Sequence, residues 1–122
     1  MTIKQKTQYK EHYNITNSIF KDIDNVILIK KTSTDASIDI KDNFLDWVYI
    51  DGDHRFKHVL NDLTLWYNKV KKGGIIAGHD YTHADIRKAI NIFLKNNTNC
   101  KLICSYNECG ADGNSDFMII KN

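Results

Sequence analysis

Apolar positions follow two periods along the chain, one typical of helices and one typical of strands. A spacing of three and four residues predicts a helix that ends near residues 24–25 and carries on one face Tyr9, Tyr13, Thr16, Ile19, Phe20 and Ile23. The all-apolar run 26–29 follows and predicts a strand covered on both faces. A short helix is expected over residues 34–41, with Ser33 or Thr34 as its cap.

The middle of the chain predicts two more strands, each opening into polar residues. Residues 45–51 are rich in β-branched and aromatic side chains and predict a buried strand that ends in Gly52-Asp53-His54. Residues 75–78 predict a second covered strand, which opens into His79-Asp80. The helix between them is stopped by Gly73-Gly74 and carries the apolar stripe Phe56, Val59, Leu60, Leu63, Tyr67 and Val70.

The last third of the chain predicts one helix and two strands. The helix closes at residues 96–97 and has on one face Ile86, Ala89, Ile90, Phe93 and Leu94. Strands over 102–106 and 117–121 are joined by 107–115, a connection short enough for antiparallel neighbours. Strands that alternate with helices imply right-handed crossovers, so the fold class is α/β: a mainly parallel, Rossmann-like sheet with helices on both faces and an antiparallel C-terminal pair.

Length and composition restrict the classes of protein that fit this pattern. A chain of 122 residues predicts one domain, residues 1–122, and 42% hydrophobic residues suffice for its core. The net charge of +2, with dispersed lysines, indicates no specific nucleic-acid partner and no membrane partner. A mean hydropathy of −0.46 and a polar start exclude a spanning helix and a secretion signal, so a soluble, cytoplasmic protein is expected.

The cysteines give no sign of a zinc site. Cys100, Cys104 and Cys109 are an odd number and lack paired spacing. We interpret them as small core or surface thiols.

Ionisable residues gather where the two central strands end. Neighbouring parallel strands lie about 5 Å apart, so Asp51 and Asp80 should converge on one small ligand. With the His79 imidazole, their oxygens would suit a divalent cation such as Mg²⁺, Mn²⁺ or Fe²⁺. The alternative is that both aspartates only cap the helices that follow.

His54 is the candidate general base at this edge. It stands three residues after Asp51, and an imidazole titrates at about pH 6.5, so it can accept a proton near neutrality. The alternative is an exposed loop histidine. The other histidines considered, His12, His58 and His83, are expected at the surface, and Trp47 and Trp66 in helix-to-sheet packing.

Three segments in order resemble one enzyme family. They are residues 45–54 (LDWVYIDGDH), residues 61–66 with Asn61-Asp62-Leu63 and Trp66, and residues 71–81 (KKGGIIAGHDY). Together they look like the class I S-adenosylmethionine-dependent methyltransferases, in the branch with the signature YIDGDH…GGIIAGHDY. The resemblance spans about residues 26–95.

The resemblance implies a mostly parallel sheet in which residues 45–51 and 73–78 are strands four and five. Residues 26–29 would be strand three, and the final pair strands six and seven, in the neighbour order four, five, seven, six. It also implies that S-adenosylmethionine contacts Thr32, Ser33 and Asp51. In related O-methyltransferases, residues at the positions of Asp51, His79 and Asp80 hold a divalent cation, although His79 stands where an acidic residue is usual. In some relatives a histidine at the position of His54 is the base.

The resemblance also implies that this chain is the C-terminal part of a methyltransferase domain. Such enzymes bind the cofactor with a Gly-rich loop after strand one and an acidic residue after strand two. No such loop occurs in this sequence. Without strands one and two, strand four becomes an open edge, which strand three, a second copy or a partner chain could cover.

Three functions follow as hypotheses. The first is methyl transfer from S-adenosylmethionine to an oxygen of a small molecule or sugar, with activity of the isolated chain left open. The second is a non-catalytic remnant or companion subunit of a methyltransferase. The third and most distant is a metal-dependent hydrolase that uses the same strand ends. The sequence does not identify the methyl acceptor.

Overall fold

The computed structural model describes residues 1–104 and 115–122. The chain divides into two compact units, Met1–Thr32 and Ser33–Asn122. That residues 1–122 form a single domain stays a prediction. None of the described helices has the length and apolar character needed to cross a membrane.

The first unit contains one long helix, α1 (Ile3–Phe20), as the apolar spacing predicted, but it ends at Phe20 and not near residues 24–25. It begins with a capping box, in which the Gln5 N–H donates to Thr2 Oγ1 and the Thr2 N–H donates to Gln5 Oε1. After the helix, the Lys30 ammonium lies 4.2 Å from the centre of the Tyr13 ring.

The predicted strand over 26–29 is wrong. These residues have no regular secondary structure and are exposed, with Ile27 at 85%. A strand needs a neighbour to satisfy its backbone N–H and C=O groups, and no described strand pairs with this segment. Four apolar residues in a row do not by themselves supply that neighbour.

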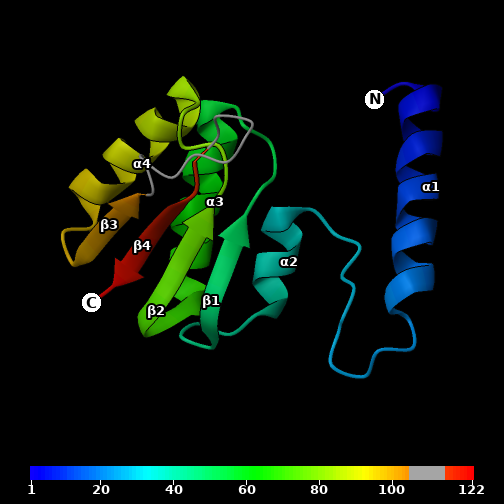
Figure 1. Ribbon diagram of the computed structural model, residues 1–122, viewed down its shortest axis with the longest axis horizontal. Helices are drawn as coiled ribbons and strands as arrows, with labels where there is room; N and C mark the ends of the chain where they lie inside the picture. The colour runs from blue at the N-terminus through cyan, green and yellow to red at the C-terminus, as the bar shows by residue number, and fades with distance from the viewer. Residues whose placement is uncertain (105–114) are drawn as a thin grey trace. The chain divides into compact units, whose positions relative to one another are not determined.

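The second unit is a mixed α/β layer (Figure 1). Its elements are α2 (Ser33–Asp39), β1 (Leu45–Ile50), α3 (Phe56–Lys69), β2 (Val70–Gly78), α4 (Ala84–Asn96), β3 (Cys100–Cys104) and β4 (Phe117–Lys121). Its described strands form a four-stranded sheet in the order β1-β2-β4-β3. β1 and β2 are parallel, whereas β4 is antiparallel to both β2 and β3. The α/β class, the antiparallel final pair and the open edge at β1 are thereby confirmed.

The junction between α3 and β2 differs from the prediction. The helix ends at Lys69, and the chain enters β2 at Val70, so the two glycines lie inside the strand. There the pairing with β1 shifts from Leu45–Val70 to Trp47–Ile75. Gly73 has φ of 80° in this irregular stretch, a left-handed conformation that glycine adopts most easily. The glycines therefore shape the strand rather than stop the helix.

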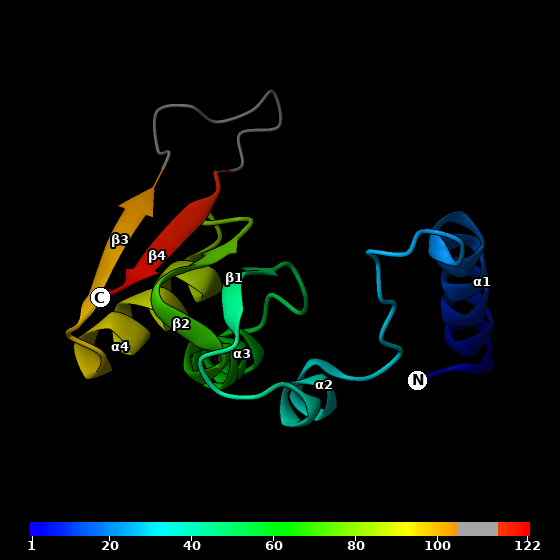
Figure 2. The same ribbon diagram turned by 90° about the horizontal axis from the view of Figure 1, so that it is seen from below.

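α3 and α4 both cover one face of the sheet (Figure 2). The paired residues Ile76 and Ile119 are fully buried there. They belong to one apolar cluster with Leu63 of α3 and Ile90 of α4. The helical stripes predicted for both helices are confirmed, because they supply or pack against this core, except that Val70 belongs to β2.

The opposite face of the sheet carries exposed apolar side chains. Strand pairing puts Trp47, Tyr49, Met118 and Ile103 on that face, at 62%, 43%, 42% and 40% exposure. Helices were expected on both faces, but among the described helices of this unit α3 and α4 share one. The prediction that residues 45–51 form a buried strand with Trp47 in packing is therefore wrong, because its outward residues meet solvent. We call these four residues the bare face.

Part of the predicted C-terminal hairpin lies outside the described residues. β3 covers Cys100–Cys104 and so begins two residues before the predicted start. Residues 105–114 are not described, and they include the last two positions of the predicted strand 102–106, Cys109 and most of the predicted connection. Cys100 and Cys104 are free, half-buried thiols. Burial raises the pKa of the Cys100 thiol.

Candidate active site

The site lies where the parallel strands β1 and β2 end side by side. Ile50 pairs with Gly78, so the residues that follow each strand start from the same level of the sheet. A side chain at Gly78 would bring a Cβ within 2.5 Å of the Ile50 carbonyl oxygen and 2.6 Å of the Phe117 ring. Glycine therefore permits the close approach that defines this edge.

The structure brings Asp51, His54 and Asp80 together. His54 Nε2 lies 3.2 Å from Asp80 Oδ2 and 3.8 Å from Asp51 Oδ1. The side chain of Asp80 is 16% exposed, while those of His54 and Asp51 are 42% and 56% exposed. The inner carboxylate can therefore hold the imidazole, and the outer two groups remain accessible to a ligand. We call these three residues the histidine–carboxylate group.

Asp80 joins two imidazoles. Its Oδ1 lies 3.1 Å from His79 Nδ1, and its Oδ2 faces His54. Its backbone is left-handed, with φ of 62°, and its carbonyl accepts a hydrogen bond from the His83 N–H at 2.8 Å. The hydrogen bond to Asp80 raises the pKa of His79, so the charged imidazolium is favoured. A non-glycine residue held in this conformation is a recognised feature of functional sites.

Asp116 and Tyr49 also reach this edge, and the sequence reasoning missed them. The Tyr49 hydroxyl donates to Asp116 Oδ1 at 3.0 Å, and the same oxygen lies 3.9 Å from His79 Nε2. Burial first, and this hydrogen bond second, raise the pKa of Tyr49 to about 12, so its hydroxyl stays protonated at neutral pH. The sequence did contain a signal for Asp116. Residues 117–121 were predicted to form an antiparallel strand, and the start of such a strand lies beside the end of β2.

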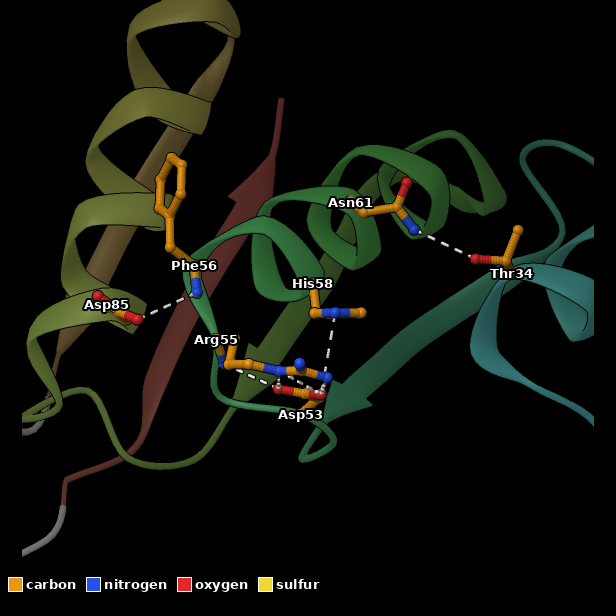
Figure 3. Close-up of polar contacts among 7 residues, drawn as sticks. All are labelled: Thr34, Asp53, Arg55, Phe56, His58, Asn61 and Asp85. Carbon is orange, nitrogen blue, oxygen red and sulfur yellow. Dashed lines mark hydrogen bonds and ion pairs between the residues drawn. The ribbon is translucent and has the colours of Figure 1, made fainter. Parts of the chain in front are cut away.

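Asp53 has a separate partner. Both its carboxylate oxygens bind the Arg55 guanidinium, and His58 Nε2 lies 4.0 Å away (Figure 3). The hydrogen bonds from Arg55 hold the pKa of Asp53 well below its usual range. His58 is exposed, as are His12 and His83, which confirms the surface positions predicted for them.

The start of α2 is held by α3. The Trp66 Nε1–H donates to Ser33 Oγ at 2.7 Å, and the Asn61 amide donates to Thr34 Oγ1 at 3.2 Å (Figure 3). The helix begins at Ser33 itself, one residue earlier than expected. In the described contacts Ser33 is not joined to the histidine–carboxylate group, and Thr32 ends the other unit.

A small hollow opens beside the histidine–carboxylate group. Its floor is apolar, with Ile50, Val59, Ile86 and Phe117, and its rim is polar, with Asp51, Asp53, His54 and His79. The hollow has room for little more than a water molecule, so a larger ligand would have to lie across its mouth, against these polar groups. The arrangement can orient a polar ligand and move a proton.

A possible metal site uses only part of the predicted ligand set. In the described residues, ligand atoms of Asp51, His54 and Asp80 lie within 4.8 Å of one another, a spacing that could close around an ion. His79 is not part of this group, because its ring nitrogens face Asp80 and Asp116.

Solved structures share this fold. A protein from Corynebacterium glutamicum matches with a TM-score of 0.71 at 11% identity, over 92% of this chain and 56% of its own. A Clostridium thermocellum protein, named as a candidate rRNA-methylase, matches with a TM-score of 0.65 at 22% identity, over 88% of this chain and 68% of its own. Both likenesses concern the fold alone.

The family follows from the sequence. A family model described as a methyltransferase domain matches residues 4–81, more than half of the chain, and the chain belongs to this methyltransferase family. The resemblance to class I S-adenosylmethionine-dependent methyltransferases is thereby confirmed. An uncharacterized protein of Acanthamoeba polyphaga mimivirus is 44% identical over 61 residues, which is 47% of this chain and 28% of that protein. The chain thus spans less than two thirds of the mimivirus and Corynebacterium proteins.

Proposed function

We propose that this chain transfers the methyl group of S-adenosylmethionine to a hydroxyl oxygen of a small molecule or sugar, with His54 as the general base. One observation carries the proposal: His54 lies 3.2 Å from the less exposed Asp80 at the carboxyl edge of the sheet, in a chain of the methyltransferase family. A base paired with an orienting carboxylate is the arrangement that proton abstraction requires.

The contact with Asp80 supports a separate role for each nitrogen of the His54 ring. Nε2 faces the carboxylate and, in the neutral ring, would carry the proton that it donates to Asp80. Nδ1 would then hold the lone pair that accepts the proton of the acceptor hydroxyl. Since 42% of the side chain is exposed, an acceptor can reach the ring.

The residues of this unit can supply hydrogen bonds to the cofactor. When bound, S-adenosylmethionine provides an electrophilic methyl group. Asp51 offers a carboxylate that is 56% exposed, and the Ser33 hydroxyl, whose oxygen accepts from Trp66, still has a hydrogen to donate. These groups suit hydroxyl and amino groups of a nucleoside. The rate would then come mainly from positioning the acceptor oxygen.

A divalent metal such as Mg²⁺ is the second candidate at this site. The spacing of Asp51, His54 and Asp80 favours it, with His79 as a neighbour of Asp80. Such an ion would orient an acceptor oxygen and favour its ionised form. If His54 Nε2 were a ligand, Nδ1 would carry the ring proton, and His54 could not accept the proton of the hydroxyl. Activation of the acceptor would then depend on the ion, so a chelator would remove activity in the metal mechanism and leave it unchanged in the mechanism with His54 as the base.

The direct test is transfer of the labelled methyl group to hydroxyl-bearing small molecules and sugars. We expect His54→Gln to lower the rate by about 10²- to 10⁴-fold, the usual contribution of a general base. His58→Gln is the matched control, an exposed histidine in the first turn of α3, and should change the rate by less than about twofold. Transfer that is unchanged in His54→Gln would contradict the assigned base.

Two further measurements complete this test. Calorimetric titration with S-adenosylmethionine should show binding, and no heat at millimolar cofactor would exclude activity of the chain on its own. Chelation should leave a metal-independent reaction unchanged, whereas loss of activity that Mg²⁺ restores would favour the metal.

A companion subunit is the second candidate function. The open edge of β1 favours it, since an unpaired strand edge can accept a strand from a partner or a second copy. Sedimentation over a range of concentrations should then show a complex. A monomer that melts cooperatively at every concentration would contradict the idea.

A further inference from the structure

The first turns of α3 and α4 are linked by one carboxylate. Asp85, in the first turn of α4, accepts a hydrogen bond from the backbone N–H of Phe56, the first residue of α3, at 3.2 Å (Figure 3). Arg55, the N-cap of α3, makes no capping hydrogen bond through its side chain in the described residues. Asp85 therefore does for α3 what an N-cap side chain normally does.

The same carboxylate lies at the N-termini of both helices. His83, the N-cap of α4, likewise makes no side-chain capping bond in the described residues, and Asp85 is the acidic residue of that first turn. Both helix N-termini carry partial positive charge, which an adjacent carboxylate stabilises. A second contact supports the same junction, because the Lys88 ammonium of α4 lies 4.6 Å from the centre of the Phe56 ring.

The linked turns follow the two loops that form the candidate site. His54 lies two residues before Phe56, and Asp80 lies five residues before Asp85. Between these loops His54 Nε2 meets Asp80 Oδ2, and the His54 and His83 rings are in edge contact with centroids 5.8 Å apart. The contacts of His54 with Asp80 and His83 restrain the distance between the two loops. The Asp85–Phe56 hydrogen bond restrains the same distance from the helices that follow them.

We propose that Asp85 is a positioning residue that, by capping α3 from α4, holds the loop of His54 against the loop of Asp80. The proposal rests on the proposed role of His54 as the base, but the contact that it concerns can be measured without catalysis. Asp85 touches neither reacting group, so its effect acts through the backbone. Removing its carboxylate should loosen the start of α3 and release the His54 ring from Asp80.

The test is nitrogen-15 nuclear magnetic resonance of the full chain. In Asp85→Ala, hydrogen exchange of the Phe56 amide should accelerate about fivefold to tenfold, as expected for a lost cap. The imidazole nitrogen signals of His54 should also shift from one fixed tautomer toward a free mixture. Asp85→Asn keeps an acceptor oxygen and should restore both signals. Asp46→Asn, which removes the carboxylate paired with Lys71 at the other end of β1, is the control and should change neither.

The outcomes separate positioning from mere capping. Faster exchange at Phe56 with unchanged His54 signals would overturn the proposal, because Asp85 would then stabilise α3 alone. If Asp85→Ala does not fold, Asp85→Glu displaces the carboxylate by one methylene and is judged by the same two signals. If Asp85→Ala loses the fixed His54 tautomer but the unsubstituted chain shows no methyl transfer, the positioning role is supported and the proposed function is contradicted.

Discussion

The two faces of the sheet differ in how well they are packed. On the covered face Ile76, Phe117 and Ile119 are at most 1% exposed beneath α3 and α4. On the bare face, Trp47 and Met118 are 62% and 42% exposed. Neighbouring residues of one strand, such as Met118 and Ile119, thus have nearly opposite environments. The covered face holds the fold together, and the bare face is apolar surface that this unit does not bury with its described helices.

The difference shows where stability and chemistry reside. Burial of apolar area is the main source of folding free energy, and here it is concentrated between one sheet face and two helices. The start of each of these helices borders the candidate site, since α3 follows the loop of His54 and α4 follows the loop of Asp80. The packing that stabilises this unit therefore also places the site. Changes at Trp47, Ile103 and Met118 of the bare face should leave both intact, whereas Tyr49 reaches the site edge through its hydrogen bond to Asp116.

The largest expected effect compares two adjacent residues of β4. Ile119→Ala should lower the free energy of unfolding by about 2–5 kcal/mol, because it removes a fully buried side chain from the core. Met118→Ala should lower it by less than about 1 kcal/mol. Urea unfolding followed by tryptophan fluorescence measures both. Similar losses for the two variants would mean that the two faces are equally packed in solution.

A smaller effect is expected where β1 and β2 approach most closely. Gly78→Ala should cost about 1–3 kcal/mol, because the new methyl group would collide with the Ile50 carbonyl and the Phe117 ring. Gly52→Ala is the control, since its Cβ would have as nearest atom Asp62 Oδ2 at 3.8 Å, an ordinary contact. The same urea titrations apply, and a Gly78→Ala protein as stable as the control would show that the strand ends can move apart.

The bare face itself can be tested with Trp47→Thr. We expect a change in unfolding free energy within about 0.5 kcal/mol, because the ring is mostly in solvent. Circular dichroism during urea unfolding follows this variant without relying on the lost fluorophore. A loss well above 1 kcal/mol would reveal that something in solution covers this face.

The smallest effect concerns pH. The pKa of His79 is raised in the folded chain by its hydrogen bond to Asp80. Its contribution to stability is therefore fully present below about pH 6.5, the ordinary histidine value, and is lost as pH rises through the raised pKa. His79→Gln should flatten the stability profile in that window. Urea midpoints between about pH 5.5 and 8.5 would show it, and a profile parallel to that of the unsubstituted chain would count against the assigned contact.

Periodicity identified the elements that bury one face. The stripes of α3 and α4 were readable because a helix with one covered face repeats every three to four residues. The prediction for Trp47 was wrong because its residue type suggested burial. Whether a strand residue is buried depends on whether helices cover the sheet face on which it lies. The run 26–29 failed in the same way, since an apolar segment cannot show whether a neighbouring strand exists.

The candidate site was only partly readable in the sequence. Asp51, His54 and Asp80 could be placed at one edge because they follow two parallel strands, and the structure brings them together. The position of Asp116 could be predicted only from the direction of β4. The role of Asp85 could be predicted only from a contact between two helices, made by residues 29 positions apart in the chain. Such contacts arise from three-dimensional packing and leave no periodic trace in the chain.

The left-handed backbone at Asp80 limits which residues can replace this aspartate during evolution. Only glycine, asparagine and aspartate adopt such a φ with ease, so other replacements would distort the turn as well as alter its charge. Asparagine and glycine are each one base change from an aspartate codon. Drift at this codon should therefore first yield a chain that keeps its shape and loses the negative charge beside His54, and with it the contact on which the proposed proton transfer rests.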